Sequence, residues 1–248
     1  MNILLSGALG HMGRAVAAQA ESEGVGILCG VDAAAGDAGF PVYPDFADAP
    51  RADVVIDFSA PQALDGLLDY CVKHQIPAVL CTTGYDNEQL ARMAEAAKQV
   101  ALFRSGNMSL GIALLRALSR KAASILGDAF DIEIVEAHHN RKKDAPSGTA
   151  LMLLNAVQEG RAEPGKPVFG RHGRDAKRQS GEIGVHALRG GTVTGEHEVC
   201  FFGPSERITL THSAESRSVF ATGALRAAAF LVGKEPGLYS MDDMVGTL

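Results

Sequence analysis

Short apolar runs alternate with amphipathic stretches along the first 110 residues of the chain. The apolar runs have the length of buried strands, and they cover residues 2–6, 26–31, 53–58, 78–81 and 101–104. The stretches between them repeat apolar side chains at helical spacing, and they cover residues 13–23, 61–74 and 87–99. Strands and helices in this alternation predict an α/β fold with a Rossmann-type, doubly wound parallel sheet.

The pattern changes after about residue 108. Helices are predicted over 110–126, from about residue 147, and over 218–232; strands are predicted over 131–135, 184–189, 195–202 and 207–212. Residues 160–179 are rich in Gly, Pro, Arg and Lys, which predicts a mobile loop. We therefore expect two domains. Residues 1–108, completed by 218–248, form a dinucleotide-binding domain, and residues 109–217 form an α+β substrate-binding and oligomerisation domain with a mixed sheet.

Composition narrows the possible partners. The net charge of −6 does not favour nucleic acid or an anionic membrane, so an anionic substrate needs a local cationic patch. Apolar runs stay well short of the roughly 18 residues that span a bilayer, and the N-terminus lacks the features of a signal peptide. The four cysteines have no metal-ligand spacing and are expected to be free thiols. We expect a cytoplasmic protein without a metal site.

A glycine-rich turn joins the first predicted strand to the first predicted helix. Gly7 permits a tight exit from the strand, Gly10 lets the backbone approach a pyrophosphate, and Gly13 allows close packing of helix and sheet. A pyrophosphate would then lie against the free amides of the helix start. The spacing GxxGxxG is less specific than GxGxxG, and the alternative interpretation is a plain tight turn.

Asp32 ends the second predicted strand, where dinucleotide-binding sheets place a carboxylate for the adenosine ribose. Three alanines follow it, at positions where an enzyme that binds a 2′-phosphate usually has arginine. This favours NADH, although His11 and Arg14 keep NADPH possible. The alternative for Asp32 is a solvated strand end.

Two further segments follow strands of the same predicted sheet, at the ends where such sheets bind ligands. Residues 81–84 offer hydroxyl groups and a glycine, and residues 105–108 offer an amide and a glycine; both are equally compatible with ordinary turns. The residues predicted to bind the cofactor are Gly7, Ala8, Leu9, Gly10, His11, Met12, Asp32, Cys81, Thr82, Thr83, Ser105, Gly106, Asn107 and Met108.

Residues 136–150 carry the most specific chemistry of the chain. This segment contains two adjacent histidines, three consecutive cations, a carboxylate and a Pro-Ser-Gly-Thr turn just before an apolar helical run. Free amides at such a helix start suit a carboxylate, while His138 and either Lys142 or Lys143 are able to exchange protons, and the residues alone do not choose between the two lysines. The segment therefore predicts an anion-binding site with proton-transfer groups, with an ordinary solvated loop over 141–143 as the alternative.

The segment 136–150 resembles the signature of the dihydrodipicolinate reductase family. The glycine turn and residues 31–32, 81–84, 107–111 and 216–217 are also similar to that family in order and spacing, so the resemblance extends over essentially the whole chain. It implies an NAD(P)H-dependent oxidoreductase that reduces 4-hydroxy-tetrahydrodipicolinate, a cyclic imine with two carboxylates, on the route to diaminopimelate and lysine. It also implies a homotetramer assembled through the second domain.

The resemblance further implies roles for five residues. His138 would be a proton donor and acceptor and Lys142 a proton donor, whereas His139, Gly148 and Thr149 would bind substrate. Hydride delivery to C4, with loss of water, pushes electrons toward the ring nitrogen, where a proton donor lowers the barrier. The residues themselves leave open which of His138 and Lys142 delivers that proton.

Two other functions remain open at this stage. An aspartate dehydrogenase-like enzyme would share the first domain, and a non-catalytic NAD sensor would keep the fold without turnover.

The other histidines are expected to be structural or exposed, and those considered are His74, His172, His186, His197 and His212.

Overall fold

The computed structural model describes residues 1–246 of the 248-residue chain. Residues 247–248, at the end of the predicted segment 218–248, lie outside the described part. Contacts divide the described chain into two compact units. Unit 1 contains residues 1–109 and 217–245, and unit 2 contains residues 110–216 together with Gly246.

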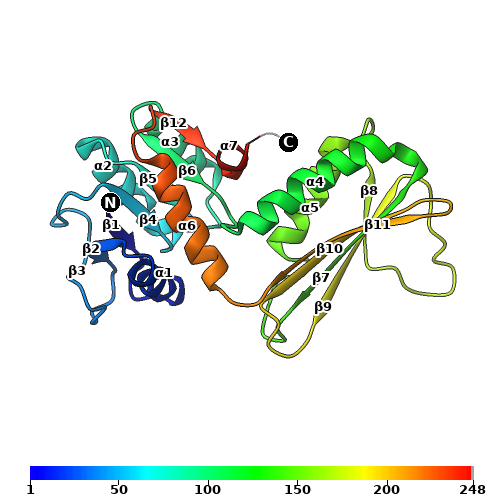
Figure 1. Ribbon diagram of the computed structural model, residues 1–248, viewed down its shortest axis with the longest axis horizontal. Coiled ribbons are helices and arrows are strands. Elements are labelled where there is room, and N and C mark those ends of the chain that lie inside the picture. Colours follow the sequence, from blue (N-terminus) through cyan, green and yellow to red (C-terminus); the bar gives the residue numbers. More distant parts are fainter. Residues whose placement is uncertain (247–248) are drawn as a thin grey trace. The chain divides into compact units, whose positions relative to one another are not determined.

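Unit 1 is a seven-stranded parallel sheet in the order β12-β6-β5-β4-β1-β2-β3 (Figure 1). The strands are β1 (Asn2–Ser6), β2 (Gly26–Val31), β3 (Val42–Tyr43), β4 (Val54–Asp57), β5 (Ala78–Leu80), β6 (Ala101–Arg104) and β12 (Gly237–Tyr239). The helices are α1 (His11–Ser22), the 3-10 turn η1 (Pro61–Ala63), α2 (Leu64–His74), α3 (Asn87–Ala96), α6 (Ser218–Leu231) and α7 (Met241–Val245). The predicted Rossmann-type sheet is confirmed.

The central strands of unit 1 form because their side chains are apolar on both faces. All four residues of β4 are buried, as expected for a parallel strand covered on both sides. Helix α3 begins at a capping box, in which Asp86 accepts the amide of Gln89 and the Gln89 side chain accepts the amide of Asp86. Strand order places β1 beside β4, so the loops after neighbouring strands share one edge of the sheet.

Unit 2 is a five-stranded mixed sheet in the order β11-β10-β7-β9-β8. Its strands are β7 (Asp131–His138), β8 (Lys166–Phe169), β9 (Glu182–Arg189), β10 (Gly195–Phe202) and β11 (Arg207–Ala214). Strand β10 is antiparallel to β7 and β11, whereas β7, β8 and β9 are parallel. The predicted mixed sheet is confirmed.

The helices of unit 2 are α4 (Leu110–Leu126), the 3-10 turn η2 (Gly127–Ala129) and α5 (Gly148–Gly160), with α4 and α5 on one side of the sheet (Figure 1). Side chains alternate along β7, so Ile132, Ile134, Glu136 and His138 share the face that α5 covers. Glu133 therefore belongs to the opposite face, which we call the uncovered face. This alternation brings a carboxylate and a histidine to the same side of one strand.

The prediction of a loop over 160–179 is wrong for residues 166–169. Strand β8 lies there, parallel to β9, with its register from Lys166 opposite Glu182 to Phe169 opposite Val185. A four-residue edge strand containing a proline has too weak a pattern to be recognised, because its pairing partner supplies the order. The end of the segment is also held against the sheet, because Arg178 donates hydrogen bonds to the carbonyls of Ile132 in β7 and Glu182 in β9.

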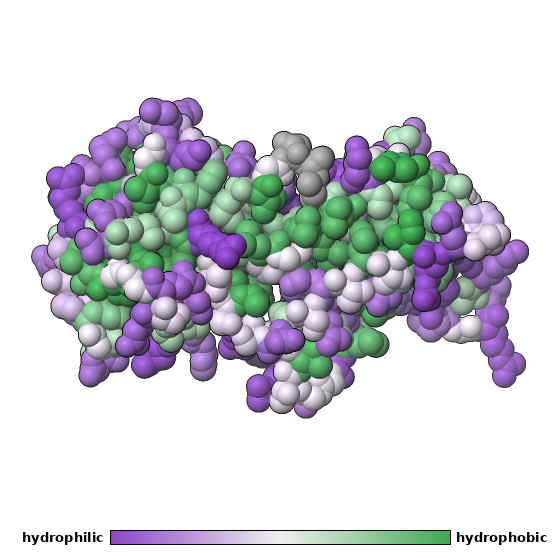
Figure 2. Space-filling view, viewed as in Figure 1, coloured by the Kyte–Doolittle hydropathy of each residue, from purple (hydrophilic) through white to green (hydrophobic). Residues whose placement is uncertain are grey.

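Helix α4 keeps apolar side chains at its surface. Leu114, Leu118 and Ile125 are exposed, together with Leu151 of α5, and apolar residues gather over α4 in the space-filling view (Figure 2).

Within residues 1–246, none of the helices combines the length and apolar character that crossing a bilayer requires.

Candidate active site

The glycine turn after β1 brings backbone atoms into close approach. Gly7 has a φ of +75°, and a Cβ there would lie 2.6 Å from the carbonyl oxygen of Phe58. A Cβ on Gly13 would overlap the Gly7 carbonyl, so helix α1 packs against the turn only because position 13 lacks a side chain. Gly10 precedes α1 without a side-chain cap. The helix start therefore presents backbone amides, as a pyrophosphate site requires.

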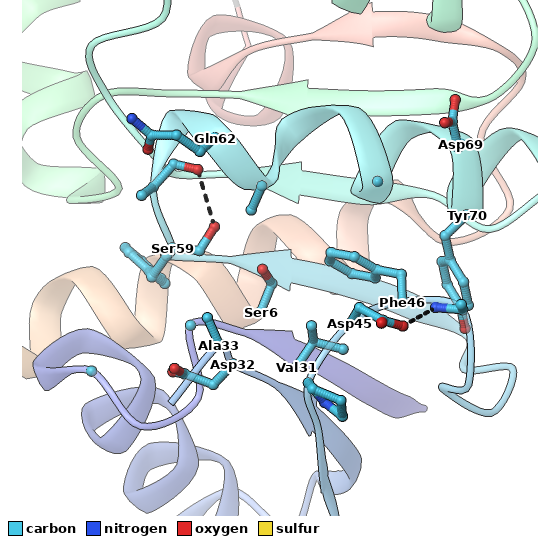
Figure 3. A pocket seen from close by; sticks show the side chains of 18 of the residues that line it. Ser6, Val31, Asp32, Ala33, Asp45, Phe46, Ser59, Gln62, Asp69 and Tyr70 are labelled. Carbon is cyan, nitrogen blue, oxygen red and sulfur yellow. Dashed lines mark hydrogen bonds between the residues drawn. The ribbon is translucent and has the colours of Figure 1, made fainter. Parts of the chain in front are cut away.

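A cavity of about 820 Å³ opens beside this turn (Figure 3). Asp32 is at one end, where its carboxylate accepts the amides of Leu9 at 2.9 Å and Ala34 at 3.0 Å. Phe46 and Tyr70 line the other end, with ring centroids 5.7 Å apart. An apolar slot that ends at a carboxylate suits an adenosine, with its base in the slot and its ribose at Asp32.

Three of the predicted cofactor residues, Gly7, Gly10 and Asp32, line this cavity. The predicted residues 81–83 and 105–108 instead follow β5 and β6, on the sheet edge that also carries the glycine turn. Ala8 and Met108 are buried, at 1% and 2% exposure, so these two residues offer little surface to a cofactor. A local hydrogen bond stabilises the turn at Asn107, in which the Ser105 hydroxyl donates to the Asn107 carbonyl at 2.6 Å.

The predicted catalytic histidine ends strand β7 of unit 2, beside a fully buried carboxylate. His138 Nδ1 lies 2.6 Å from Glu136 Oε2, and Arg189 forms a two-pronged ion pair with Glu136 at 2.7 Å from each oxygen. The amide of Ser147 donates to Glu136 Oε1 at 2.9 Å. Burial by itself raises the pKa of Glu136, but the hydrogen bonds from Arg189, His138 and Ser147 outweigh it and lower the pKa. Because an ionised carboxylate only accepts hydrogen bonds, His138 donates its Nδ1 hydrogen to Glu136, and in the neutral ring Nε2 is the acceptor nitrogen.

Helix α5 begins beside this carboxylate. Ser147 caps the helix by accepting the amide of Ala150 at 3.1 Å, while its own amide is bonded to Glu136. Neither bond uses the amide of Gly148. This residue is exposed, and a Cβ added to it would meet nothing within 4 Å. The two predicted carboxylate-binding residues, Gly148 and Thr149, are thus the first two residues of α5. A helix start of this kind attracts an anion.

The predicted proton donor Lys142 belongs to the loop between β7 and α5. Its Nζ lies 2.9 Å from Asp144 Oδ1, and this hydrogen bond lowers the pKa of Asp144. Arg189 donates to the Asp144 carbonyl at 2.7 Å, which ties the loop to the buried carboxylate. The amide of His139 bonds the carbonyl of Val193 at 2.8 Å. Lys143 is exposed and Lys142 is half-buried, so the two neighbouring lysines differ in environment.

His197 of β10 completes the cluster. Its Nε2 lies 3.2 Å from Ser147 Oγ, and its ring centroid is 5.2 Å from that of His138 in an edge-on arrangement. Burial, and next the proximity of His138, lower the pKa of His197 to about 4, so it is neutral at ordinary pH. Gly195, on the same strand, leaves room for His138, because a Cβ there would lie 3.1 Å from His138 Nε2.

Glu136 and Arg189 were given no role from the sequence, and His197 was expected to be structural or exposed, which its burial fits. The first was recognisable, because residues two apart on an alternating strand share a face, so Glu136 and His138 had to be neighbours. The other two come from β9 and β10, 53 and 50 residues from the groups that they contact. No local pattern announces such contacts, because they depend on the register of the sheet.

Comparisons with known proteins cover the chain from end to end. A family profile described as "Dihydrodipicolinate reductase, N-terminus" matches residues 1–108, and one described as "Dihydrodipicolinate reductase, C-terminus" matches residues 111–245. A protein of Caldanaerobacter subterraneus subsp. tengcongensis named 4-hydroxy-tetrahydrodipicolinate reductase is 49% identical over 247 residues, covering 99% of this chain and 98% of its own. A protein of the same name from Clostridium novyi is 45% identical over 246 residues, covering 98% and 97%.

One solved structure has a similar fold over the full length. It is described as dipicolinate bound dihydrodipicolinate reductase from Paenisporosarcina sp. TG-14, and it matches with a TM-score of 0.81 at 21% identity, covering 99% of both chains. At this identity the likeness shows the fold alone.

Proposed function

The chain belongs to the dihydrodipicolinate reductase family, and we propose that its residues carry out that family's reaction in the roles described below. The protein is an NAD(P)H-dependent 4-hydroxy-tetrahydrodipicolinate reductase of lysine biosynthesis. Its overall reaction takes 4-hydroxy-tetrahydrodipicolinate, NAD(P)H and a proton to tetrahydrodipicolinate, NAD(P)⁺ and water. Its place of action would be the cytoplasm, where cysteines such as its four free thiols stay reduced.

Unit 1 fits a dinucleotide. The cradle left by Gly7 and Gly13 admits no added Cβ, and the adjoining cavity ends at the carboxylate of Asp32. The glycine turn, Asp32 and the residues that follow β5 and β6 would hold the cofactor. When bound, NAD(P)H supplies the hydride for C4 of the substrate ring.

Unit 2 offers the groups that the substrate needs. The start of α5 at Gly148 and Thr149 would bind one ring carboxylate through backbone amides, with His139 as a further contact. Lys142 would neutralise negative charge on the substrate and donate a proton, and His138 would exchange a proton through Nε2. Reduction at C4 sends electrons toward the ring nitrogen, and a positioned acid lowers the barrier to that change.

One observation carries the proposal. The buried carboxylate of Glu136 bonds both His138 and the capping residue of α5, so a proton-exchanging imidazole and an anion-binding helix start lie side by side. A non-catalytic sensor does not require this pairing, and the family matches over residues 1–108 and 111–245 favour the reductase over an aspartate dehydrogenase-like enzyme.

The direct test is turnover with the product of dihydrodipicolinate synthase, measured as the loss of NADH absorbance. We expect His138→Gln and Lys142→Ala each to lower kcat roughly 100-fold or more while NADH still binds, because each removes a proton-transfer group. A wild-type protein that binds NADH without turnover would favour the sensor, and turnover of oxaloacetate with ammonia would favour the aspartate dehydrogenase-like enzyme. Near-normal kcat in either variant would remove that residue from the mechanism.

The preferred cofactor would be NADH. Asp32 lies where a 2′-phosphate would meet a negative charge, and arginine is absent from the described residues that line the cavity. We expect kcat/KM for NADH to be at least that for NADPH. Asp32→Ser should lower this ratio about tenfold by removing the repulsion. The matched control is Asp69→Ser, at the far end of the cavity, which should leave the ratio unchanged. A strong NADPH preference of the wild type would contradict this assignment.

A homotetramer formed through the unit 2 sheet would account for its uncovered face. Leu188 and Phe202 are 56% and 38% exposed there, and Val135 on the same face is half-buried. Light scattering on the purified protein should give four times the 26.0 kDa of one chain. Leu188→Glu should reduce the assembly, and a monomeric wild type would contradict it.

A further inference from the structure

We propose that Glu136 and Arg189 are positioning residues for this reaction, because one carboxylate orients both the imidazole and the substrate-binding helix start. The inference rests on the proposed roles of His138, Lys142 and the start of α5. Neither Glu136 nor Arg189 needs to contact substrate to act in this way. Their effect passes through three other groups, and each link is a hydrogen bond of this structure.

The first link fixes the imidazole. Glu136 Oε2 takes the Nδ1 hydrogen of His138 at 2.6 Å, which determines both the ring orientation and the tautomer. His138 Nε2 is then directed to the side where Gly195 has no side chain. Without an ionised partner on Nδ1, the neutral ring would be able to carry its hydrogen on Nε2 and to rotate.

The second link fixes the helix start. Glu136 Oε1 accepts a hydrogen bond from the Ser147 amide at 2.9 Å. The same carboxylate therefore holds both His138 and the residue that caps α5. The next residue is Gly148, whose amide is proposed to bind a carboxylate. A rigid separation between anion site and proton-transfer group is what catalysis of a ring reaction requires, because small misplacements lower the rate strongly.

The third link reaches the lysine loop. Arg189 bonds both oxygens of Glu136 at 2.7 Å and also the carbonyl of Asp144 at 2.7 Å. The Asp144 side chain in turn meets Lys142 Nζ at 2.9 Å. The guanidinium therefore connects the buried carboxylate to the loop that carries Lys142. A lysine at position 189 would offer no planar fork to make these bonds together.

A role in stability alone is the competing explanation. A buried ion pair is weak evidence for stability, because the desolvation of two charges offsets their attraction. Glu136 accepts four hydrogen bonds, and two of them come from groups of the proposed site. Packing alone would be satisfied by an apolar pair of the same volume, whereas orienting a His tautomer requires a carboxylate.

Glu136→Gln tests the inference with nearly unchanged volume. Its amide group would have one acceptor oxygen instead of two, so its NH2 group would face a donor of Arg189 and one of either His138 or Ser147, and the Nδ1 hydrogen would be held less firmly. We expect kcat to fall at least about tenfold, by the same tautomer effect that other carboxylate–histidine pairs show. KM for NADH should stay within about twofold, because that cofactor is proposed to bind unit 1.

The matched control is Glu133→Gln on the same strand. Glu133 also pairs with an arginine, Arg178, and a histidine, His186, but on the uncovered face. We expect its kcat to stay within about twofold of the wild type. Equal losses of kcat in the two variants would overturn the inference, as they would indicate a general effect on the sheet.

A double-mutant cycle separates positioning from stability. If Glu136 acts through His138, Glu136→Gln should cost less than about threefold in kcat when His138 is already Gln. Multiplicative losses would overturn this link. Should Glu136→Gln fail to fold, Arg189→Lys serves instead, with an expected loss of at least about threefold that again shrinks in the His138→Gln background. An inactive wild type would refute the proposed function, whereas an active wild type with unaffected Glu136→Gln and Arg189→Lys would refute this inference alone.

Discussion

Strand β7 carries two clusters of the same residue types on its two faces. Glu136 meets Arg189 and His138 on the face covered by α5, and its side chain is 0% exposed. Glu133 meets Arg178 and His186 on the uncovered face, and its side chain is 20% exposed. The clusters are three residues apart along the strand but belong to opposite sides of it.

The difference shows that environment, and not residue type, decides what such a cluster does. On the covered face water is excluded, every oxygen of the carboxylate is bonded, and the pair fixes the groups of the proposed site. On the uncovered face of a single chain the Glu133 carboxylate keeps contact with solvent, and Arg178 joins the segment that precedes β9 to Ile132 of β7. Three predictions test this contrast, beginning with the largest expected effect.

Truncating the two carboxylates should have unequal effects on stability. Glu136→Ala leaves Arg189 beside an empty buried site, so the free energy of unfolding of unit 2 should fall by about 3 kcal/mol. Glu133→Ala removes a partly solvated partner and should cost about 1 kcal/mol. Urea denaturation followed by circular dichroism measures both values. Equal losses would remove the distinction between the two faces.

The covered face should also make stability depend on pH through His197. Its pKa is about 4 in the folded unit and 6.5 as the ordinary value, so below pH 6.5 the unfolded chain binds a proton that the folded unit does not. The contribution of neutral His197 to the free energy of unfolding is therefore fully present above pH 6.5 and is lost as the pH falls toward 4. Between pH 7 and pH 5 the loss from this group should be about 2 kcal/mol.

His197→Gln should remove that part of the pH dependence while keeping a partner for Ser147. The free energy of unfolding of the variant should accordingly change less than that of the wild type between the two pH values, as urea denaturation reports. Parallel curves for the two proteins would mean that His197 is not held neutral by burial.

The uncovered cluster should affect a loop more than the reaction. Arg178→Gln removes donors to the carbonyls of Ile132 and Glu182, so trypsin should cleave residues 170–181 several-fold faster. We expect kcat to remain within about twofold. Arg92→Gln, which disrupts ion pairs to Asp65 and Asp69 in unit 1, is the control and should leave that cleavage rate unchanged. A large loss of kcat in Arg178→Gln would contradict this prediction, because it would show that the cluster on the uncovered face also affects the reaction.

Local periodicity was sufficient for much of the fold. Helix α4 and strand β10 have the predicted bounds, because each has a strong pattern of its own. Strand β12 was not predicted, since its three residues become a strand only by pairing with β6 at the sheet edge. The same holds for β8 beside β9.

The candidate site divides in the same way. His138, Lys142 and Gly148 were predicted as site residues because they are close in sequence and form one signature, and their roles stay predictions. Arg189 was not, because the register between β7 and β9 alone places it opposite His138. Residues that lie close together in sequence could thus be predicted as a site, whereas Arg189 could be placed beside them only from the register of the sheet.

A structure with bound pyridine-2,6-dicarboxylate and NADH tests the central claim most directly, because the uncovered face also carries cations, Arg171 and Arg178, beside Glu133. We predict that one carboxylate accepts the Gly148 amide at the start of α5, with His138 and Lys142 within hydrogen-bond reach of the diacid. A diacid bound on the uncovered face, against Arg171 and Arg178, with no anion at the start of α5, would contradict the account.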